Sequence, residues 1–295
     1  MQEPKALILR GVAGVYLLAN PENNFQGKAV ARGLFRKDNI KPLPGDVVYY
    51  KPSHDPDIPY YISEILPRKN QLARPPMANL DRLFLLAAAT NPAIDFHYLD
   101  RMICYARNNH MDLSLVLTKC DEVGAEEGIK VFEDYFKFSG FPRYHLSLED
   151  HKVVDELKEI ICSGGLSAFA GQSGVGKSTL MNRIMGSELL ETGNLSEKVG
   201  RGKQTTRSVE IYQVGKAFLA DTPGFQSLDI EKMGIEARDL VLAYPEIMEI
   251  AQDCRFSDCK HMGDVGCAIA EAKIHPKRLE NYRKLRKDLE DHVKY

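Results

Sequence analysis

The sequence predicts a multidomain protein in which a small β-barrel comes first, an α/β domain with a mainly parallel sheet second, and a mostly helical segment last. Three observations support this order. Short strands and turns fill the first 70 residues, apolar runs then alternate with helical stretches, and the strand pattern ends near Ile230. The chain of 295 residues is also too long for one ordinary hydrophobic core. We therefore expect domains at residues 1–70, 71–230 and 231–295.

The net charge of −2 hides a strong separation of charge along the chain. Residues 1–75 hold eleven Lys or Arg against seven Asp or Glu, and residues 271–295 hold eight against five, so the middle of the chain carries −9. Basic ends of this kind favour contact with a polyanion such as RNA. The alternative is that the cations only solvate two surfaces.

Composition indicates a globular chain, because 44% of the residues are hydrophobic and 27% are charged. No long apolar segment follows the basic residues at the start of the sequence. The longest continuous apolar run, residues 83–89, is too short to cross a bilayer. We therefore expect a cytoplasmic protein.

Five short strands are predicted before residue 70. They are rich in Val, Ile, Leu and Tyr and are separated by turn residues, and they cover 6–10, 14–19, 28–32, 46–50 and 60–65. So many strands in so short a segment favour a closed or nearly closed barrel, because an open sheet would leave unpaired edges. An oligonucleotide-binding (OB) barrel is the leading candidate.

Two segments near the barrel have a predicted role. RGLFRK, residues 32–37, places three cations around Phe35, which suits phosphate contact and stacking on a base. The alternative is that Phe35 belongs to the barrel core. After the barrel, Pro75 and Pro76 predict a stiff, extended linker.

The middle of the chain alternates apolar runs with helical patterns, which predicts βαβ units and a mainly parallel sheet buried on both faces. The apolar runs are 83–89, 113–117, 166–170 and 217–220, and the helical stretches lie around 97–108, 126–138 and 151–161.

A phosphate-binding loop is predicted directly after the strand at 166–170. It matches G-x-x-x-x-G-K-[ST] at every position and consists of Gly171, Gln172, Ser173, Gly174, Val175, Gly176, Lys177 and Ser178. The glycines let backbone N–H groups wrap around phosphate, Lys177 neutralises β- and γ-oxygens, and Ser178 is the expected Mg²⁺ ligand. A helix beginning at Thr179 then points its N-terminus at the anion.

A second phosphate motif, Asp221-Thr-Pro-Gly224, follows the strand at 217–220. We expect the Asp221 carboxylate to hold the metal through water and the Gly224 N–H to sense the γ-phosphate. Between the two motifs lies GRGKQTTR, where a hydroxyl of Thr205 or Thr206 would complete the Mg²⁺ shell. The sequence leaves open which threonine does so.

A base-reading motif is predicted where the strand at 113–117 ends, in Thr118, Lys119, Cys120 and Asp121. Guanine needs an acceptor for its N1–H and N2–H₂ groups, which an Asp carboxylate supplies with two hydrogen bonds. Thr118 stands where Asn is commoner, and its hydroxyl can still make a tethering hydrogen bond. The end of a parallel strand is also where ligands of α/β sheets bind. The expected ligand is GTP or GDP.

The motifs occur in an unusual order, because the base-reading motif comes before the phosphate loop. Joining the ends of an ordinary GTPase and reopening the chain after Asp-Thr-Pro-Gly would give this order and leave every loop in place. Ser147 falls between the two motifs, where a further base-contacting loop is expected. The sequence therefore predicts a circularly permuted P-loop GTPase domain.

A metal site is predicted at Cys254, Cys259, His261 and Cys267, four soft ligands within fourteen residues. This set suffices for one closed structural Zn²⁺ site, and the alternative is ordinary core cysteines. The remaining cysteines are scattered and are expected only to pack.

After the cluster, apolar residues at helical spacing from Leu279 to Val293 predict a last helix. Seven Lys or Arg and one Glu between 273 and 287 give it a basic face.

These features together resemble the ribosome small-subunit-dependent GTPase A family of circularly permuted bacterial GTPases. The resemblance rests on the five-stranded barrel, TKCD before GQSGVGKST, GKQTT, DTPGF and the Cys/His cluster, and it covers essentially the whole chain. It implies GTP hydrolysis on the small ribosomal subunit, contact with its rRNA, and action late in maturation of that subunit. We expect a monomer that leaves the subunit after hydrolysis.

The usual catalytic group is absent from its expected position. Most GTPases orient the attacking water with a Gln after Asp-x-x-Gly, and Phe225 stands there in this chain, which predicts slow hydrolysis by the protein alone. Gln204 is a candidate to position water in place of the His that is common in the family. Two alternatives stay open: a nucleotide-dependent RNA-binding module without multiple turnover, and a permuted GTPase acting on another ribosomal particle.

Overall fold

The computed structural model describes residues 3–31, 35, 40–147, 151–186, 209–222, 234–271 and 273–292. The chain divides into two compact units. The first holds residues 1–82, 154–169 and 179–225, and the second holds 83–153, 170–178 and 226–295. Within the described residues no helix is long and apolar enough to cross a membrane.

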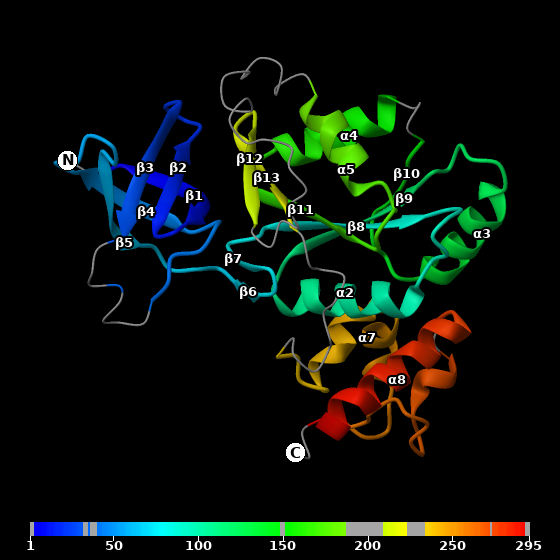
Figure 1. The fold of residues 1–295 in the computed structure, drawn as a ribbon. Coiled ribbons are helices and arrows are strands. Elements are labelled where there is room, and N and C mark those ends of the chain that lie inside the picture. The colour runs from blue at the N-terminus through cyan, green and yellow to red at the C-terminus, as the bar shows by residue number, and fades with distance from the viewer. Residues whose placement is uncertain are drawn as a thin grey trace. The chain divides into compact units, whose positions relative to one another are not determined.

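The N-terminal strands close into a barrel with the hydrogen-bonded order β1-β2-β3-β5-β4. The strands are β1 (Lys5–Val12), β2 (Val15–Asn20), β3 (Phe25–Ala31), β4 (Val47–Pro52) and β5 (Tyr60–Ile65). β3 and β5 are parallel and the other pairs antiparallel, which confirms the predicted OB-type barrel. The fully buried core residues Ile8, Leu18, Val48 and Ile62 each come from a different strand. Figure 1 shows this barrel in blue.

Phe35 packs against the barrel core, alongside Phe25 and Tyr60. This placement supports the core interpretation of Phe35 and not the base-stacking one, because a partly buried ring that contacts the core has less surface to offer to a base. The flanking cations of residues 32–37 lie outside the described residues.

The predicted extended linker is wrong, because residues 71–78 form a hairpin. β6 (Gln71–Ala73) pairs antiparallel with β7 (Pro76–Ala78), and the turn between them contains Pro75. Leu72 and Met77 are buried, and the Ala78 N–H donates to Pro44 O at 2.9 Å. Proline is compatible with this edge position because its missing N–H is not needed by a two-stranded ladder. The burial of alternate apolar side chains thus overcomes the stiffness of the Pro-Pro pair.

The α/β region contains a six-stranded sheet with the order β10-β9-β8-β11-β13-β12. β10 and β9 are parallel, β11 and β13 are parallel, and β12 runs antiparallel to β13. The strands are β8 (Arg82–Ala88), β9 (Asp112–Thr118), β10 (Arg143–His145), β11 (Leu166–Gly171), β12 (Glu210–Val214) and β13 (Ala217–Asp221). The four predicted apolar runs are therefore strands, and the predicted central α/β domain is confirmed.

Helices occupy the three stretches predicted from periodicity and the segment after the phosphate loop. They are α2 (Phe96–Asn108), α3 (Ala125–Phe136), α4 (His151–Cys162) and α5 (Lys177–Met185). α2 begins at a side-chain cap, since the Asp95 carboxylate accepts the Tyr98 N–H at 2.9 Å. α5 begins at Lys177, within the phosphate loop, and α3 begins at Ala125, four residues after Asp121.

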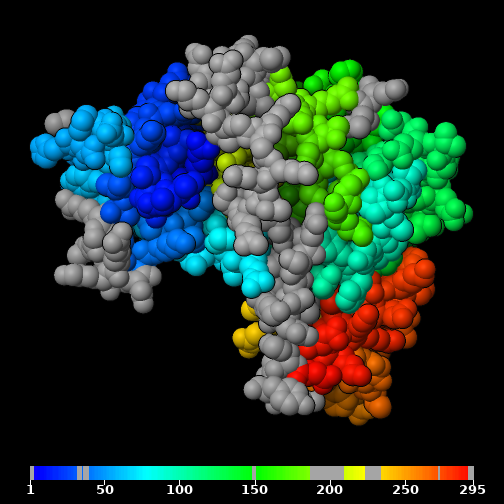
Figure 2. All heavy atoms as spheres, viewed as in Figure 1, coloured from blue at the N-terminus to red at the C-terminus, as the bar shows by residue number. Residues whose placement is uncertain are grey.

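All regular elements in the described part of the C-terminal segment are helices, and turns and bends connect them. Its elements are the 3₁₀ helices η4 (Asp239–Ala243) and η5 (Ala268–Glu271) and the helices α7 (Pro245–Ala251) and α8 (Pro276–His292). The helix predicted from Leu279 onward is confirmed, with Tyr282, Leu285 and Leu289 buried. α8 and η4 both contact α2. Figure 2 shows the orange and red atoms near the C-terminus next to one another.

The predicted basic face of α8 needs one correction, because Arg278 is fully buried. Its position explains why, since 278 precedes the buried residues Tyr282, Leu285 and Leu289 by four, seven and eleven positions and so lies on the same helical face. Lys277, in contrast, is exposed.

Candidate nucleotide and metal sites

The phosphate loop runs from the end of β11 into the start of α5. Gly174 and Gly176 have φ values of 81° and 90°, in the left-handed region that only glycine enters readily. Val175 between them is fully buried and anchors the loop. The Lys177 ammonium donates to Gly171 O at 2.7 Å and to Gln172 O at 2.6 Å, so it is held beside the loop backbone.

The base-reading motif is bonded to this loop. The Thr118 hydroxyl, at the end of β9, lies 2.7 Å from Val175 O and 3.0 Å from Ala87 O. Thr118 is 2% exposed, so its hydroxyl bonds in an environment with little competing water. The tethering role expected of this hydroxyl is therefore present as a hydrogen bond between two motifs 57 residues apart in sequence.

The other residues of the motif are placed by the turn that follows β9. Lys119 has a φ of 58°, and its ammonium donates to Asn91 O in the loop after β8. The Cys120 N–H donates to Leu146 O at 3.2 Å, and burial raises the pKa of the Cys120 thiol to about 11. That thiol therefore stays protonated near neutral pH, whereas the Asp121 side chain is exposed to solvent at the same edge of the sheet.

The second phosphate motif begins where β13 ends. Asp221 is exposed there, and Thr222 is buried, with its hydroxyl donating to Phe169 O of β11 at 3.2 Å. Ser147, suggested for base contact, follows β10 and is partly buried. Gly224, Phe225, Gln204, Thr205 and Thr206 all lie outside the described residues.

The four predicted metal ligands come together. One ligand atom from each of Cys254, Cys259, His261 and Cys267 lies within 4.8 Å of the others. The His261 Nδ1 atom is 3.6 Å from Cys254 Sγ and 3.7 Å from Cys267 Sγ. A tetrahedral site with Zn–S of about 2.3 Å and Zn–N of about 2.0 Å has S···N edges of roughly 3.6 Å. The donor set and its spacing therefore fit zinc.

The surroundings of the cluster also suit thiolate ligands. Backbone N–H groups of Ala268 and Ile269 donate to Cys254 Sγ and Cys267 Sγ, both at 3.4 Å. Such bonds stabilise negative charge on sulfur and orient it toward a metal. The Tyr282 hydroxyl of α8 donates to Lys260 O at 3.1 Å, so the cluster is joined to the last helix.

A buried network that the sequence did not reveal connects α8 to α2 and α7. The Arg278 guanidinium pairs with Asp100 of α2 and Glu246 of α7, and both carboxylates are buried. It also donates to Ala243 O at 2.8 Å and lies 4.4 Å from the Tyr244 ring centroid. The sequence signal for this network was an arginine in line with the apolar face of α8.

The network continues to α3. The Tyr135 hydroxyl donates to Asp100, and the Asn281 amide donates to Tyr135 Oη at 2.7 Å and to Asp100 Oδ2 at 3.1 Å. Burial is the largest influence on the Asp100 carboxyl and raises its pKa, which Arg278 opposes. The Arg278 guanidinium and the Asp100 carboxylate are therefore held by several hydrogen-bonding partners in a region shielded from solvent.

The sheet order, the phosphate loop and the base-reading strand that precedes it in sequence define a circularly permuted P-loop GTPase. The family described as RsgA GTPase matches residues 65–231, and the family described as RsgA N-terminal domain matches residues 5–57. The chain belongs to the RsgA GTPase family.

Relatives cover almost the whole chain. A Bacillus pumilus protein named small ribosomal subunit biogenesis GTPase RsgA is 36% identical over 95% of this chain and 94% of its own length. A Caldanaerobacter subterraneus protein of the same name is 39% identical over 92% and 90%. This chain thus has a counterpart along at least nine tenths of each of these relatives.

Two solved structures share the fold. The crystal structure of YjeQ from Thermotoga maritima has a TM-score of 0.81 and 27% identity, and covers 98% of this chain and 99% of its own. YloQ, described as a circularly permuted GTPase, has a TM-score of 0.79 and 29% identity, with 98% and 96% coverage. The permuted arrangement expected from motif order is therefore confirmed.

Asp121 provides a direct test of base reading. If Asp121 reads guanine, Asp121→Asn should lower the affinity for GTP about 100-fold, since the two charge-assisted hydrogen bonds expected from its carboxylate would be lost. The same change should raise the affinity for XTP, because the amide donates to the xanthine O2 where the carboxylate is repelled. Titration of fluorescent GDP and XDP analogues measures both. Glu126→Gln, on the exposed first turn of α3, is the control and should change neither.

Proposed function

We propose that this protein is a GTP hydrolase that acts late in the biogenesis of the small ribosomal subunit, is activated by that subunit and leaves it after hydrolysis. The observation that carries the proposal is the hydrogen bond from Thr118 to Val175 O of the phosphate loop, because it joins the proposed guanine reader to the proposed triphosphate site. The names of the relatives supply the particle.

The roles of the nucleotide-site residues are part of the proposal. Asp121 reads the base, Lys119 lies along it, and residues 171–178 hold the phosphates. Lys177 exchanges its two backbone carbonyl partners for β- and γ-oxygens when GTP enters. Ser178 and Thr206, or Thr205 in its place, complete the Mg²⁺ shell, and Asp221 holds the ion through water.

Catalysis in this proposal depends on the ribosomal particle. Phe225 cannot orient water, so hydrolysis by the protein alone is slow. Gln204 positions the attacking water through its amide but cannot act as a base. The ribosomal particle then supplies or orders the group that orients the attacking water.

The proposed metal and RNA contacts lie outside the nucleotide site. Cys254, Cys259, His261 and Cys267 hold one structural Zn²⁺, which fixes the loop beneath α8. The barrel and the exposed lysines of α8 face rRNA, and Arg278 takes no part because it is buried. We place the domain limits near residues 70 and 230.

Nucleotide state is expected to control release. The segment after Asp221-Thr-Pro-Gly224 leads directly into the C-terminal helical region, so loss of the γ-phosphate would shift that region and weaken its contact with rRNA. Small-subunit affinity should be about tenfold higher with a non-hydrolysable GTP analogue than with GDP, a usual size for such coupling. Cosedimentation over a range of subunit concentrations measures it, and equal affinities would contradict the proposed release.

A further inference from the structure

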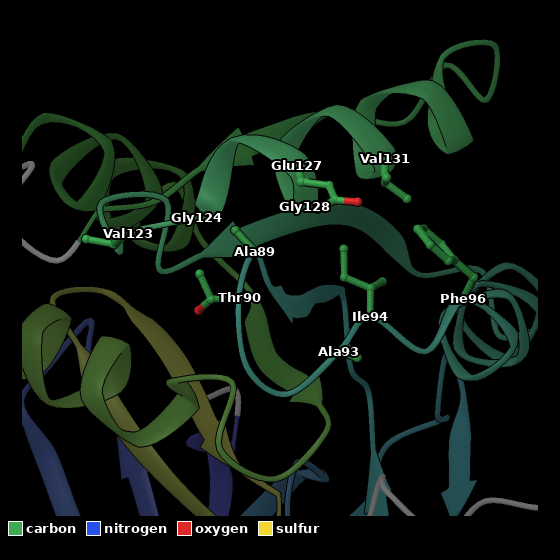
Figure 3. Close-up of a pocket in the computed structure, with 10 residues that line it drawn as sticks. All are labelled: Ala89, Thr90, Ala93, Ile94, Phe96, Val123, Gly124, Glu127, Gly128 and Val131. Carbon is green, nitrogen blue, oxygen red and sulfur yellow. The ribbon is translucent and has the colours of Figure 1, made fainter.

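A groove separates the loop after β8 from the first two turns of α3, close to the base-reading motif. It has a volume of about 400 Å³. Figure 3 shows Ile94 and Phe96 on one side and Val131 on the other, with Val123 at the far end. Val123 is fully exposed and Val131 is 42% exposed, so apolar side chains face water along the groove.

Negative charge surrounds this apolar floor. Residues 89–96 and 119–131 contain five carboxylates and two cations, Lys130 and Lys119, and the Lys119 ammonium donates to Asn91 O. All five carboxylates are on exposed residues, namely Asp95, Asp121, Glu122, Glu126 and Glu127. An apolar floor with an acidic rim favours a basic ligand with an apolar anchor and repels nucleic acid and anionic lipid.

The walls of the groove are held in place by packing. A Cβ at Gly128 would lie 1.8 Å from Ala89 O, so a glycine is required for α3 to approach the β8 loop this closely. The Thr90 hydroxyl bonds to Glu122, which ties the two walls at one end. At the other end Phe96 stacks on Tyr135 with ring centroids 4.0 Å apart. A preformed groove loses little entropy on binding.

We propose that this groove, between the β8 loop and α3, docks a lysine- and arginine-rich peptide segment through one large apolar side chain. We assign that segment to a basic extension of a small-subunit ribosomal protein, and this assignment rests on the proposed function. Such extensions carry positive charge because they lie against RNA. A volume of about 400 Å³ accommodates one bulky anchor and part of the adjoining backbone.

The chemistry of the occupant is tested with synthetic peptides and the intact protein. A fluorescein-labelled peptide of lysines and arginines around one central leucine should bind, and replacing the leucine with serine should weaken binding about tenfold. Val131→Lys should weaken binding by a similar factor, whereas Phe138→Lys, on an exposed residue beyond the end of α3, should not. If both substitutions act equally, or the serine peptide binds as well, the groove is not the docking site.

The source of the segment is tested by photo-crosslinking on purified small subunits with a non-hydrolysable GTP analogue. A benzophenone amino acid at position 131 should crosslink to ribosomal protein, and the same group at position 138 should not. Crosslinks from 131 to rRNA, to a second copy of this chain, or to nothing in a protein that still cosediments would overturn the proposal. If the protein does not cosediment at all, the proposed function fails, and the peptide titration still decides whether the groove binds basic segments.

Discussion

Arg278→Met is expected to lower the free energy of unfolding by about 3–5 kcal/mol, the usual cost of removing one partner of a buried ion pair. Asp100 and Glu246 would remain buried without their cation, and Ala243 O would lose its donor. Urea unfolding followed by circular dichroism measures the loss. Lys287→Met, an exposed change on the same helix, should fall within about 0.5 kcal/mol of the unchanged protein.

The same variant should show a characteristic dependence on pH. Burial raises the pKa of Asp100, and Arg278 is a main influence that opposes the rise. Without Arg278, the folded-state pKa of this carboxyl lies further above its unfolded value. A raised carboxyl pKa favours the folded state at low pH and disfavours it as pH increases. The defect should therefore be smaller at mildly acidic than at mildly alkaline pH, and a defect independent of pH would contradict the buried-charge explanation.

Removing the metal ligand Cys254 is expected to have the second large effect. Structural zinc sites contribute on the order of 10 kcal/mol to the folding of small metal domains. Cys254→Ser should abolish stoichiometric zinc and unfold the segment around the cluster, because Cys254 Sγ also accepts the Ala268 N–H. Loss of order should reach α8 through the bond from Tyr282 to Lys260 O.

Zinc content measured by plasma mass spectrometry, together with protease sensitivity of the C-terminal region, tests this expectation. Cys162→Ser is the matched control, since Cys162 lies on α4, outside the cluster, and its thiol donates to Val214 O at 3.9 Å. The control should keep its zinc. If the Cys254 variant also kept a full equivalent of zinc, the four-ligand site would be wrong.

Sequence patterns predicted the elements whose interacting residues lie close together along the chain. The buried strands β8, β9, β11 and β13 were visible as apolar runs, and the phosphate loop as glycines that its backbone geometry requires. The cysteine cluster was visible because its ligands lie close together in sequence. In each case the residues that interact are near neighbours or repeat with a fixed period.

Features that depend on distant partners could not be predicted in this way. Arg278 and Asp100 are 178 residues apart, and a lysine- or arginine-rich helix is ordinarily solvated, so the buried pair gave no clear signal. The hairpin of β6 and β7 was missed because Pro75 and Pro76 suggested stiffness while the burial of Leu72 decided the structure. The groove beside α3 forms only where the loop after β8 lies against that helix, and these two segments are distant in sequence.

The central claim is that the early Thr118–Asp121 motif and the later phosphate loop form one GTP site that works on the small ribosomal subunit. GTP hydrolysis by the purified protein alone, with small subunits and with large subunits tests it most directly. We predict slow hydrolysis alone, many turnovers per protein with small subunits, and no stimulation by large subunits. Stimulation by large subunits instead, or a single turnover that stops in the presence of small subunits, would contradict it.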